Sequence, residues 1–292
     1  MHKFLNTIGF GNLKSNKEIK KLLNEIEETP QEHEIVSSKV ESNVWEYRRW
    51  YTKSIGILIG GEMDEASDTF EREYYFPFLH GRGSTSHAEV LIERRIEKEQ
   101  YIGVCDDMRV GVSLIFQLQN AYQFMNARDL GKLPIVATSL TLSGLAESGV
   151  VLFPVKKSKI QEEEMKEEYR DRAMLLNAAK DGDHEAMETL AMEDINVYTT
   201  VSNRLCKEDV FSIVDTYFMP FGVECDQYAI LGEILDIKEE ENVKTKERVY
   251  IMHLNVNDMK FDVCIAANSL TGEPAIGRRL KSNIWLQGRI NY

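Results

Sequence analysis

The segment His-Gly-Arg-Gly-Ser-Thr-Ser-His at positions 80–87 holds the residue types best suited to binding an anion. Its glycines let successive backbone N–H groups point at one acceptor, and Arg82, Ser84 and Thr85 add a cation and two hydroxyls. His80 and His87 stand at its two ends. These residues predict a cradle for a phosphate or carboxylate group. The same residue types also form ordinary turns, which is the favoured interpretation. The segment is not a P-loop, because no helix carrying a Lys-Ser/Thr pair follows it.

The same segment also supplies two imidazoles that could join Cys105 and the pair Asp106-Asp107 in a metal centre. Such residue types suit zinc or iron. The seven-residue step from His80 to His87 is not a known ligand spacing, and no CxxC pair occurs among the four cysteines. The sequence therefore predicts neither a metal site nor a cofactor.

Signatures of covalent or cofactor-dependent catalysis are missing from the sequence. Ser143 lies in Thr-Leu-Ser-Gly-Leu, which lacks the first glycine of a nucleophile elbow. There is no HExxH motif, and Gly9 and Gly11 have no third glycine that would complete a dinucleotide fingerprint. No catalytic residue can be named, and whether the protein is an enzyme stays open.

A second cluster lies near the C-terminus, where Arg278, Arg279 and Lys281 precede Trp285. On a small barrel, basic and aromatic side chains on one face form a platform for single-stranded nucleic acid. The net charge of −13 opposes this function, and residues 228–292 carry nine basic and nine acidic side chains, hence no excess of cations. The alternative is a strand entry with a core tryptophan, so nucleic-acid binding is not the favoured function.

Hydrophobic periodicity predicts an α+β fold whose N-terminal domain, residues 1–155, contains a mostly antiparallel sheet. Apolar residues at helical spacing indicate a helix over 16–28, and a period of two then replaces the helical one. Strands are expected at 55–59, 90–96, 110–118, 134–142 and 149–155.

The rest of the chain divides into a helical connector, residues 156–227, and a small β-barrel domain, residues 228–292. In the connector we expect an αα-hairpin followed by further helix, with helices at 161–180, 184–192 and 195–205 and a short one after Lys207. In the barrel we expect an OB-like arrangement of short strands at 228–237, 249–256, 260–266 and 283–290, with a charged turn at 238–247.

Composition and the ends of the chain limit the class of protein. With 292 residues, 43% of them hydrophobic and 28% charged, the chain can build real cores. The N-terminus has no apolar stretch typical of a signal peptide, and the longest uncharged run, between Arg109 and Arg128, contains five amides. We therefore expect no membrane span and a cytoplasmic location with reduced thiols.

Several stretches together resemble an uncharacterised domain-of-unknown-function family of clostridial Firmicutes. They are MHKFLNTIGF, YYFPFLHG, YIGVCDDMRVGVSLIFQLQNA, SIVDTYFMPFGVECDQYAILGEILDI and FDVCIAANSLTGEPAIGRRLKSNIWLQGRI. The resemblance covers essentially the whole chain and implies a recurring bacterial protein. It brings no activity, cofactor or site residue with it.

The expected function is a binding or protein-interaction module without catalytic activity. A protein partner or a homodimer could meet an aromatic patch formed by Trp45, Tyr47, Trp50 and Tyr51, although such residues also pack on sheets. One alternative is an enzyme or sensor that binds a small phosphorylated or acidic ligand at the loop 80–87. The other is single-stranded nucleic-acid binding through Arg278, Arg279 and Trp285.

Overall fold

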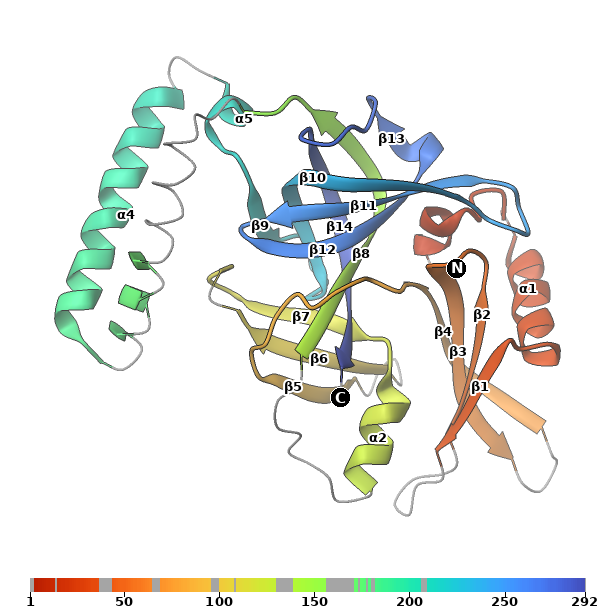
Figure 1. Cartoon of the computed structure of the whole chain (residues 1–292). Helices are drawn as coiled ribbons and strands as arrows, with labels where there is room; N and C mark the ends of the chain where they lie inside the picture. The colour runs from red at the N-terminus through yellow and green to blue at the C-terminus, as the bar shows by residue number, and fades with distance from the viewer. Residues whose placement is uncertain are drawn as a thin grey trace.

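The computed structural model shows an α+β protein built from a four-stranded sheet, a closed five-stranded barrel and a few helices (Figure 1). It confirms the predicted fold class. The residues that the structure describes are 3–13, 15–36, 44–64, 69–95, 100–107, 109–129, 139–155, 171–172, 174–176, 178–179, 182–205 and 209–291.

The N-terminal region begins with two helical elements, η1 (Lys3–Ile8) and α1 (Asn16–Glu28). The helix begins at a capping box in which Ser15 and Glu18 satisfy each other's backbone N–H groups. Its apolar face is buried, as its spacing predicts, through Ile19, Leu22, Leu23 and Ile26. The predicted helix over residues 16–28 is therefore confirmed at both ends.

The first sheet is antiparallel, with its four strands in chain order. They are β1 (Glu32–Val36), β2 (Val44–Trp50), β3 (Ile55–Asp64) and β4 (Thr69–Leu79). Apolar residues of these strands pack against α1 and η1. The strand expected around Ile55–Ile59 is present as part of β3, but every residue from Ile55 to Gly61 is buried, so buried and exposed positions do not alternate there.

The barrel closes through five strands, each of which pairs with two neighbours. They are β8 (Ser139–Leu152), β10 (Gln227–Glu241), β11 (Arg248–Val256), β12 (Met259–Ala266) and β14 (Arg279–Asn291). The meander β10-β11-β12 is closed by β8, which runs parallel to β12 and antiparallel to β14, while β14 also pairs with β10. These neighbour relations resemble an OB-type barrel whose last strand comes first in the chain. The barrel thus takes one strand from residues 1–155.

Further strands extend this closed barrel. The short strands β9 (Tyr217–Pro220) and β13 (Leu270–Thr271) pair with β10 and β8. On the other side, β14 pairs with β7 (Ser113–Leu118). Strand β7 pairs in turn with β6 (Gln100–Asp106), and β6 pairs with β5 (Val90–Arg95). The helix α2 (Ala121–Asp129) follows β7.

Two hydrophobic cores hold these parts together. One fills the barrel interior and the adjoining β5–β7 extension. The other lies between α1, η1, the first sheet and the outer face of the barrel, which contributes Leu145, Ile251, Cys264 and Trp285. A barrel strand therefore presents apolar side chains to both cores, so the first sheet is packed directly on the barrel wall.

Several predicted boundaries are wrong. The strands expected at 134–142 and 149–155 are, within the described residues, the single strand β8, because its pairing with β14 extends from Ser139 to Leu152. Strand β10 runs through Glu241, into the expected turn, because the charged residues after Ile237 stay paired with β11. Strand β7 begins only at Ser113.

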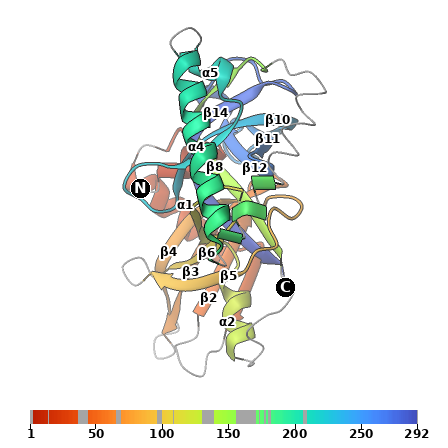
Figure 2. The same cartoon turned by 90° about the vertical axis from the view of Figure 1, so that its left-hand side faces the viewer.

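The helices expected at 184–192 and 195–205 are one helix, α4 (His184–Leu205), which no residue interrupts. Figure 2 shows α4 on the outside of the molecule, and the short α5 (Val210–Ile213) follows it as expected. Most of the helix predicted over 161–180 falls outside the described residues. No helix in the described part of the chain is long and apolar enough to cross a membrane.

Candidate functional site

A polar pocket of 220 Å³ lies where the first sheet meets the start of α2 and the end of β14. In Figure 1, α2 lies beside β1 at this place. The pocket is lined by Glu32, Arg48, Trp50, Leu58, Phe78, His80, Gln119, Asn120, Tyr122, Gln123 and Arg289. The lining combines an apolar wall with two arginines, a histidine and several amides.

The first sheet positions one side of this pocket by simple strand geometry. Arg48 and Trp50 are two residues apart on β2 and therefore face the same way. Glu32 pairs directly with Arg48 across the β1–β2 ladder, and its carboxylate accepts a hydrogen bond of 3.1 Å from Nε1 of Trp50. The ladder thus holds one acid, one cation and one indole at the rim.

Buried amides form the floor of the pocket and join it to the barrel. Nε2 of Gln119 donates to the carbonyl of Leu79 at 2.8 Å and to Oε1 of Gln287 at 2.9 Å. The amide of Gln287 in turn donates to the carbonyl of Pro77 and accepts from the N–H of Leu79. The two amides satisfy backbone groups of Pro77 and Leu79, so they join β4 to β14, which no ladder among the described strands pairs directly.

Asn120 fixes the opposite wall in a similar way. Its side chain donates to the carbonyl of Ile290 at 2.8 Å and accepts from the N–H of Ile290 at 3.1 Å. It also donates to Gln123, whose amide donates to the hydroxyl of Tyr122. The first turn of α2 is therefore tied to β14, and Tyr122 is held at the pocket.

The guanidinium of Arg48 stands between the pocket and a buried carboxylate. Its Nη2 lies 3.0 Å from the carbonyl of Gln119 and 3.3 Å from Oε2 of Glu46, and the group stacks 5.1 Å from the ring of Tyr122. Burial raises the pKa of Glu46, although Arg48 and the hydroxyl of Tyr74 oppose that rise. Arg48 thus stays rigidly placed while part of its fork faces the pocket.

The second cation, Arg289, meets His80. Nη1 of Arg289 lies 2.7 Å from Nε2 of His80, so the imidazole accepts this hydrogen bond in its neutral form. The backbone of His80 is fixed by its N–H bond to Ser54, and its ring lies 5.8 Å from Trp50. Partial burial lowers the pKa of His80, and the charges of Arg289 and Arg48 lower it further. Of the residues predicted for the anion, metal and nucleic-acid sites, only His80 lines the pocket in the described structure, and Trp50 of the predicted aromatic patch lines it too.

Arg82 of the loop 80–87 is bound to the barrel by the protein's own carboxylates. The backbone N–H of Arg82 donates to Oδ2 of Asp262 at 2.9 Å, and its Nε donates to Oδ1 at 3.1 Å. Nη1 of Arg82 donates to Asp236 at 2.6 Å, and His253 also contacts Asp262. The carboxylate of Asp262 therefore occupies the cradle that the sequence suggests for an external anion.

The hydroxyl residues of the loop divide into buried and exposed ones. Thr85 is buried, with its hydroxyl donating to the carbonyl of Lys260 and accepting from the N–H of Leu142. Ser84 and His87 are exposed, with 3.5 Å between Oγ and Nε2. The loop thus brings neither Thr85 nor His87 to the pocket that His80 lines.

The candidate metal ligands stand in different surroundings. Cys105 is buried, and burial raises the pKa of its thiol to about 11. Beside it, the hydroxyl of Ser86 donates to Asp107 at 2.7 Å. Asp107 is paired with Arg109. Within the described ranges, no group of three or more His, Cys, Asp or Glu residues could hold a metal ion.

The basic and aromatic residues near the C-terminus make contacts within the protein itself. Arg279 is buried and donates to the carbonyls of Phe153, Val214, Asp215 and Phe211. Trp285 is also buried, with its ring stacked 5.2 Å from that of Phe4. Arg278 contacts the ring of Phe153 and the carbonyl of Glu273. Neither Arg279 nor Trp285 presents a surface on which a base could stack.

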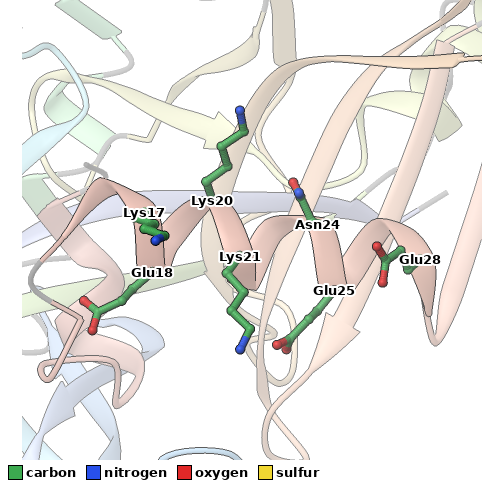
Figure 3. A pocket seen from close by; sticks show the side chains of 7 residues that line it. All are labelled: Lys17, Glu18, Lys20, Lys21, Asn24, Glu25 and Glu28. Atoms are coloured by element: carbon green, nitrogen blue, oxygen red, sulfur yellow. The ribbon is translucent and has the colours of Figure 1, made fainter.

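A larger hollow of 530 Å³ lies along α1, but its shape does not suit a ligand. Figure 3 shows that its labelled side chains come from one helix and point to different sides, with Lys20 and Asn24 opposite Lys21 and Glu25. Glu25 is paired with Lys244 of the barrel. Since these groups diverge, the hollow is a charged helix surface.

Most pocket residues could not be predicted from the sequence. The amides Gln119, Asn120 and Gln123 stand out in the sequence only as polar residues within a long run that carries no charge. That position was the available signal, because amides in an apolar segment must find partners when the segment is buried. Arg48 and Arg289 lie 241 positions apart, and no local pattern links them.

Comparison with known families assigns the chain to one of them. Residues 5–288 match the family described as a domain of unknown function, E. rectale gene description (DUF3881), and the chain belongs to this family. The resemblance seen in the sequence is thereby confirmed. No curated protein and no solved structure matches the chain.

Proposed function

We propose that this protein is a cytoplasmic bacterial binding module, without catalytic activity of its own, that holds a small anionic ligand in the pocket between the first sheet and the barrel. The ligand is a phosphorylated or acidic small molecule. The site is centred on Arg48, His80 and Arg289 and includes only the first residue of the loop 80–87.

One observation carries this proposal: two arginines and a histidine from different elements meet in one concavity of a chain whose net charge is −13. Arg48 comes from β2, His80 follows β4, and Arg289 belongs to β14. Glu32 is the one acid that lines the pocket among the described residues. Arg48 is also paired with Glu46, so the positive charge that remains for a ligand comes mainly from Arg289, and this charge favours an anion.

The test is isothermal titration calorimetry of the whole protein with glycerol 3-phosphate, inorganic phosphate and succinate. We expect Arg289→Gln to weaken binding of the accepted probe about tenfold, the equivalent of about 1.4 kcal/mol. Arg248→Gln is the matched control, because Arg248 is an exposed arginine of β11 outside the pocket. If none of the probes binds, or if both variants lose affinity equally, the proposal fails.

A second candidate function is a protein contact through α4. Its surface exposes Met187, Met192 and Ile195, with 44%, 66% and 62% of each residue accessible. Grouped apolar side chains on one helix suit a partner surface or a second copy of this chain. Light scattering after size exclusion tests the homodimer: a dimer of the native chain should become monomeric in Met192→Lys/Ile195→Lys, and a monomeric native chain contradicts it.

A further inference from the structure

The two pocket arginines have N–H groups that make no hydrogen bond to the described residues. Arg48 uses only Nη2, and Arg289 uses only Nη1, in the contacts recorded among the described residues. Each guanidinium has five N–H donors in a planar fork. Nε and the second terminal nitrogen of each arginine are therefore available to an incoming acceptor.

The geometry points to a small phosphate monoester as the ligand, with its dianionic group accepting from Arg48 and Arg289 and drawing one proton from solvent onto His80. This inference rests on the proposed anion-binding function and specifies its ligand and its regulation. A phosphate group offers three strongly accepting oxygens, one for each of the three basic side chains. A monocarboxylate offers two oxygens and a single negative charge, so it matches the two arginines and His80 less well.

The other surfaces of the pocket limit the organic part of the ester. Leu58, Phe78 and the ring of Trp50 form an apolar wall, and Trp50 packs edge-on to Phe78 with ring centroids 4.8 Å apart. The volume of 220 Å³ is below the roughly 300–1,000 Å³ of sites for drug-sized ligands. A short carbon skeleton fits this space, whereas a nucleotide does not.

His80 is the group through which binding responds to pH. Arg289 faces it from β14, Arg48 from β2 and Glu32 from β1, so two cations and one acid surround it. Because its Nε2 accepts from Arg289, the neutral ring carries its proton on Nδ1. Burial and the two cations hold its pKa below the ordinary value. A dianion between these cations offsets their repulsion, which raises the pKa of His80 and makes binding take up a proton. The proton goes to Nε2, which then no longer accepts from Arg289, so Nη1 of Arg289 turns to the dianion.

Sulfate is the probe for proton uptake, because it is a dianion that does not titrate near neutral pH. Calorimetry in two buffers of different ionisation enthalpy measures the protons taken up on binding, between pH 5.5 and 8. Affinity should rise as the pH falls, by up to about tenfold for each unit by which the dianion raises the pKa of His80. Glycerol 3-phosphate, inorganic phosphate and succinate then rank the ligand classes at one pH.

His80→Gln should still bind sulfate but with its proton uptake lost, and His184→Gln, an exposed histidine of α4, should behave as the native protein does. Circular dichroism checks that both variants fold. Burial also raises the pKa values of Glu34 and Glu46, which both lie near the charge of Arg48. The proton uptake assigned to His80 is therefore the difference in uptake between the native protein and His80→Gln.

Each outcome decides a separate point. Ester binding with proton uptake that depends on His80 supports the inference. Binding without proton uptake, uptake unchanged in His80→Gln, or succinate binding as tightly as the ester overturns it while the anion-binding function stands. If no anion binds, both the inference and the proposed function are wrong.

Discussion

The loop 80–87 has two parts with basic residues in different surroundings: the pocket end, His80, and the clasped end, residues 82–87. At the clasped end Arg82 is paired with Asp236 and Asp262, so the protein's own carboxylates balance its charge. At the pocket end His80 meets Arg289, and a second arginine, Arg48, lines the same pocket although it is also paired with Glu46. Among the described residues no acid is paired with Arg289, and an arginine without an acidic partner is the better indication of a ligand site.

The two ends should also respond oppositely to acid. The clasped end is held by carboxylates, among them Asp107, which accepts from Ser86 and Arg109. The pocket end gains positive charge when His80 is protonated. Acid should therefore loosen the clasped end from the barrel and strengthen anion binding at the pocket end.

Gly81→Ala should have the largest effect on this comparison, because the residue joins the two ends. A Cβ at this position would lie 2.8 Å from the carbonyl oxygen of Leu142 on β8. Such overpacking against barrel backbone should lower the free energy of unfolding by about 3 kcal/mol. Urea denaturation measures this. Gly83→Ala is the control: its added Cβ meets no atom within 4 Å, and its φ of +72° predicts a loss of only about 1 kcal/mol.

Arg82→Ala should destabilise the fold without changing ligand affinity. Asp262 is almost completely buried, and it would keep the backbone N–H and His253 but lose the guanidinium. We expect the free energy of unfolding to fall by about 2 kcal/mol. Denaturation and calorimetry on the same sample separate the two effects. A loss of sulfate affinity with full stability would reverse the roles given to the two ends.

Asp107→Asn should reduce the acid sensitivity of the clasped end. Burial alone would raise the pKa of Asp107, but hydrogen bonds from Arg109 and Ser86 lower it below its ordinary value. Its stabilisation is therefore complete above about pH 4 and is lost as the pH falls through the lower folded-state pKa. The free energy of unfolding, followed from pH 6 to pH 2.5, should change less in the variant, by about 1 kcal/mol. Parallel curves would refute this.

Glu32→Gln should have the smallest effect, and it is a gain. The substitution removes the acid at the rim of the pocket and keeps an acceptor for Nε1 of Trp50. Because the carboxylate is exposed, sulfate affinity should rise only two- to threefold, about 0.5 kcal/mol. Titration at low salt measures it best, and raising the salt concentration should erase the gain. Unchanged or weaker binding at low salt would place the anion away from Glu32.

Local pattern predicted much of the fold. The helix over 16–28 follows from its apolar spacing and from Ser15 and Glu18 at its start, and the strand at Ile55–Ile59 follows from period two. These features depend on residues a few positions apart. The predicted strand boundaries were wrong where pairing with a strand distant in the sequence sets them. Strand β8 is an example, because its continuity comes from its long pairing with β14.

The candidate site was less accessible to sequence reasoning. The residue types of the loop 80–87 single it out in the sequence, yet Asp262, 180 positions after Arg82, decides what that arginine contacts. Arg48 and Arg289 become neighbours of His80 only because Gln119 and Gln287 join β4 to β14. Such contacts leave no local signal.

The sequence by itself determined the α+β class, the α1 helix, the barrel meander and the membership of a family, because these depend on composition, periodicity and short motifs. The tertiary structure alone decided which charges are paired and which face a pocket. The physical reason is that the effect of a charge depends on the distance to its partners and on burial. Both quantities are fixed only when distant segments pack together.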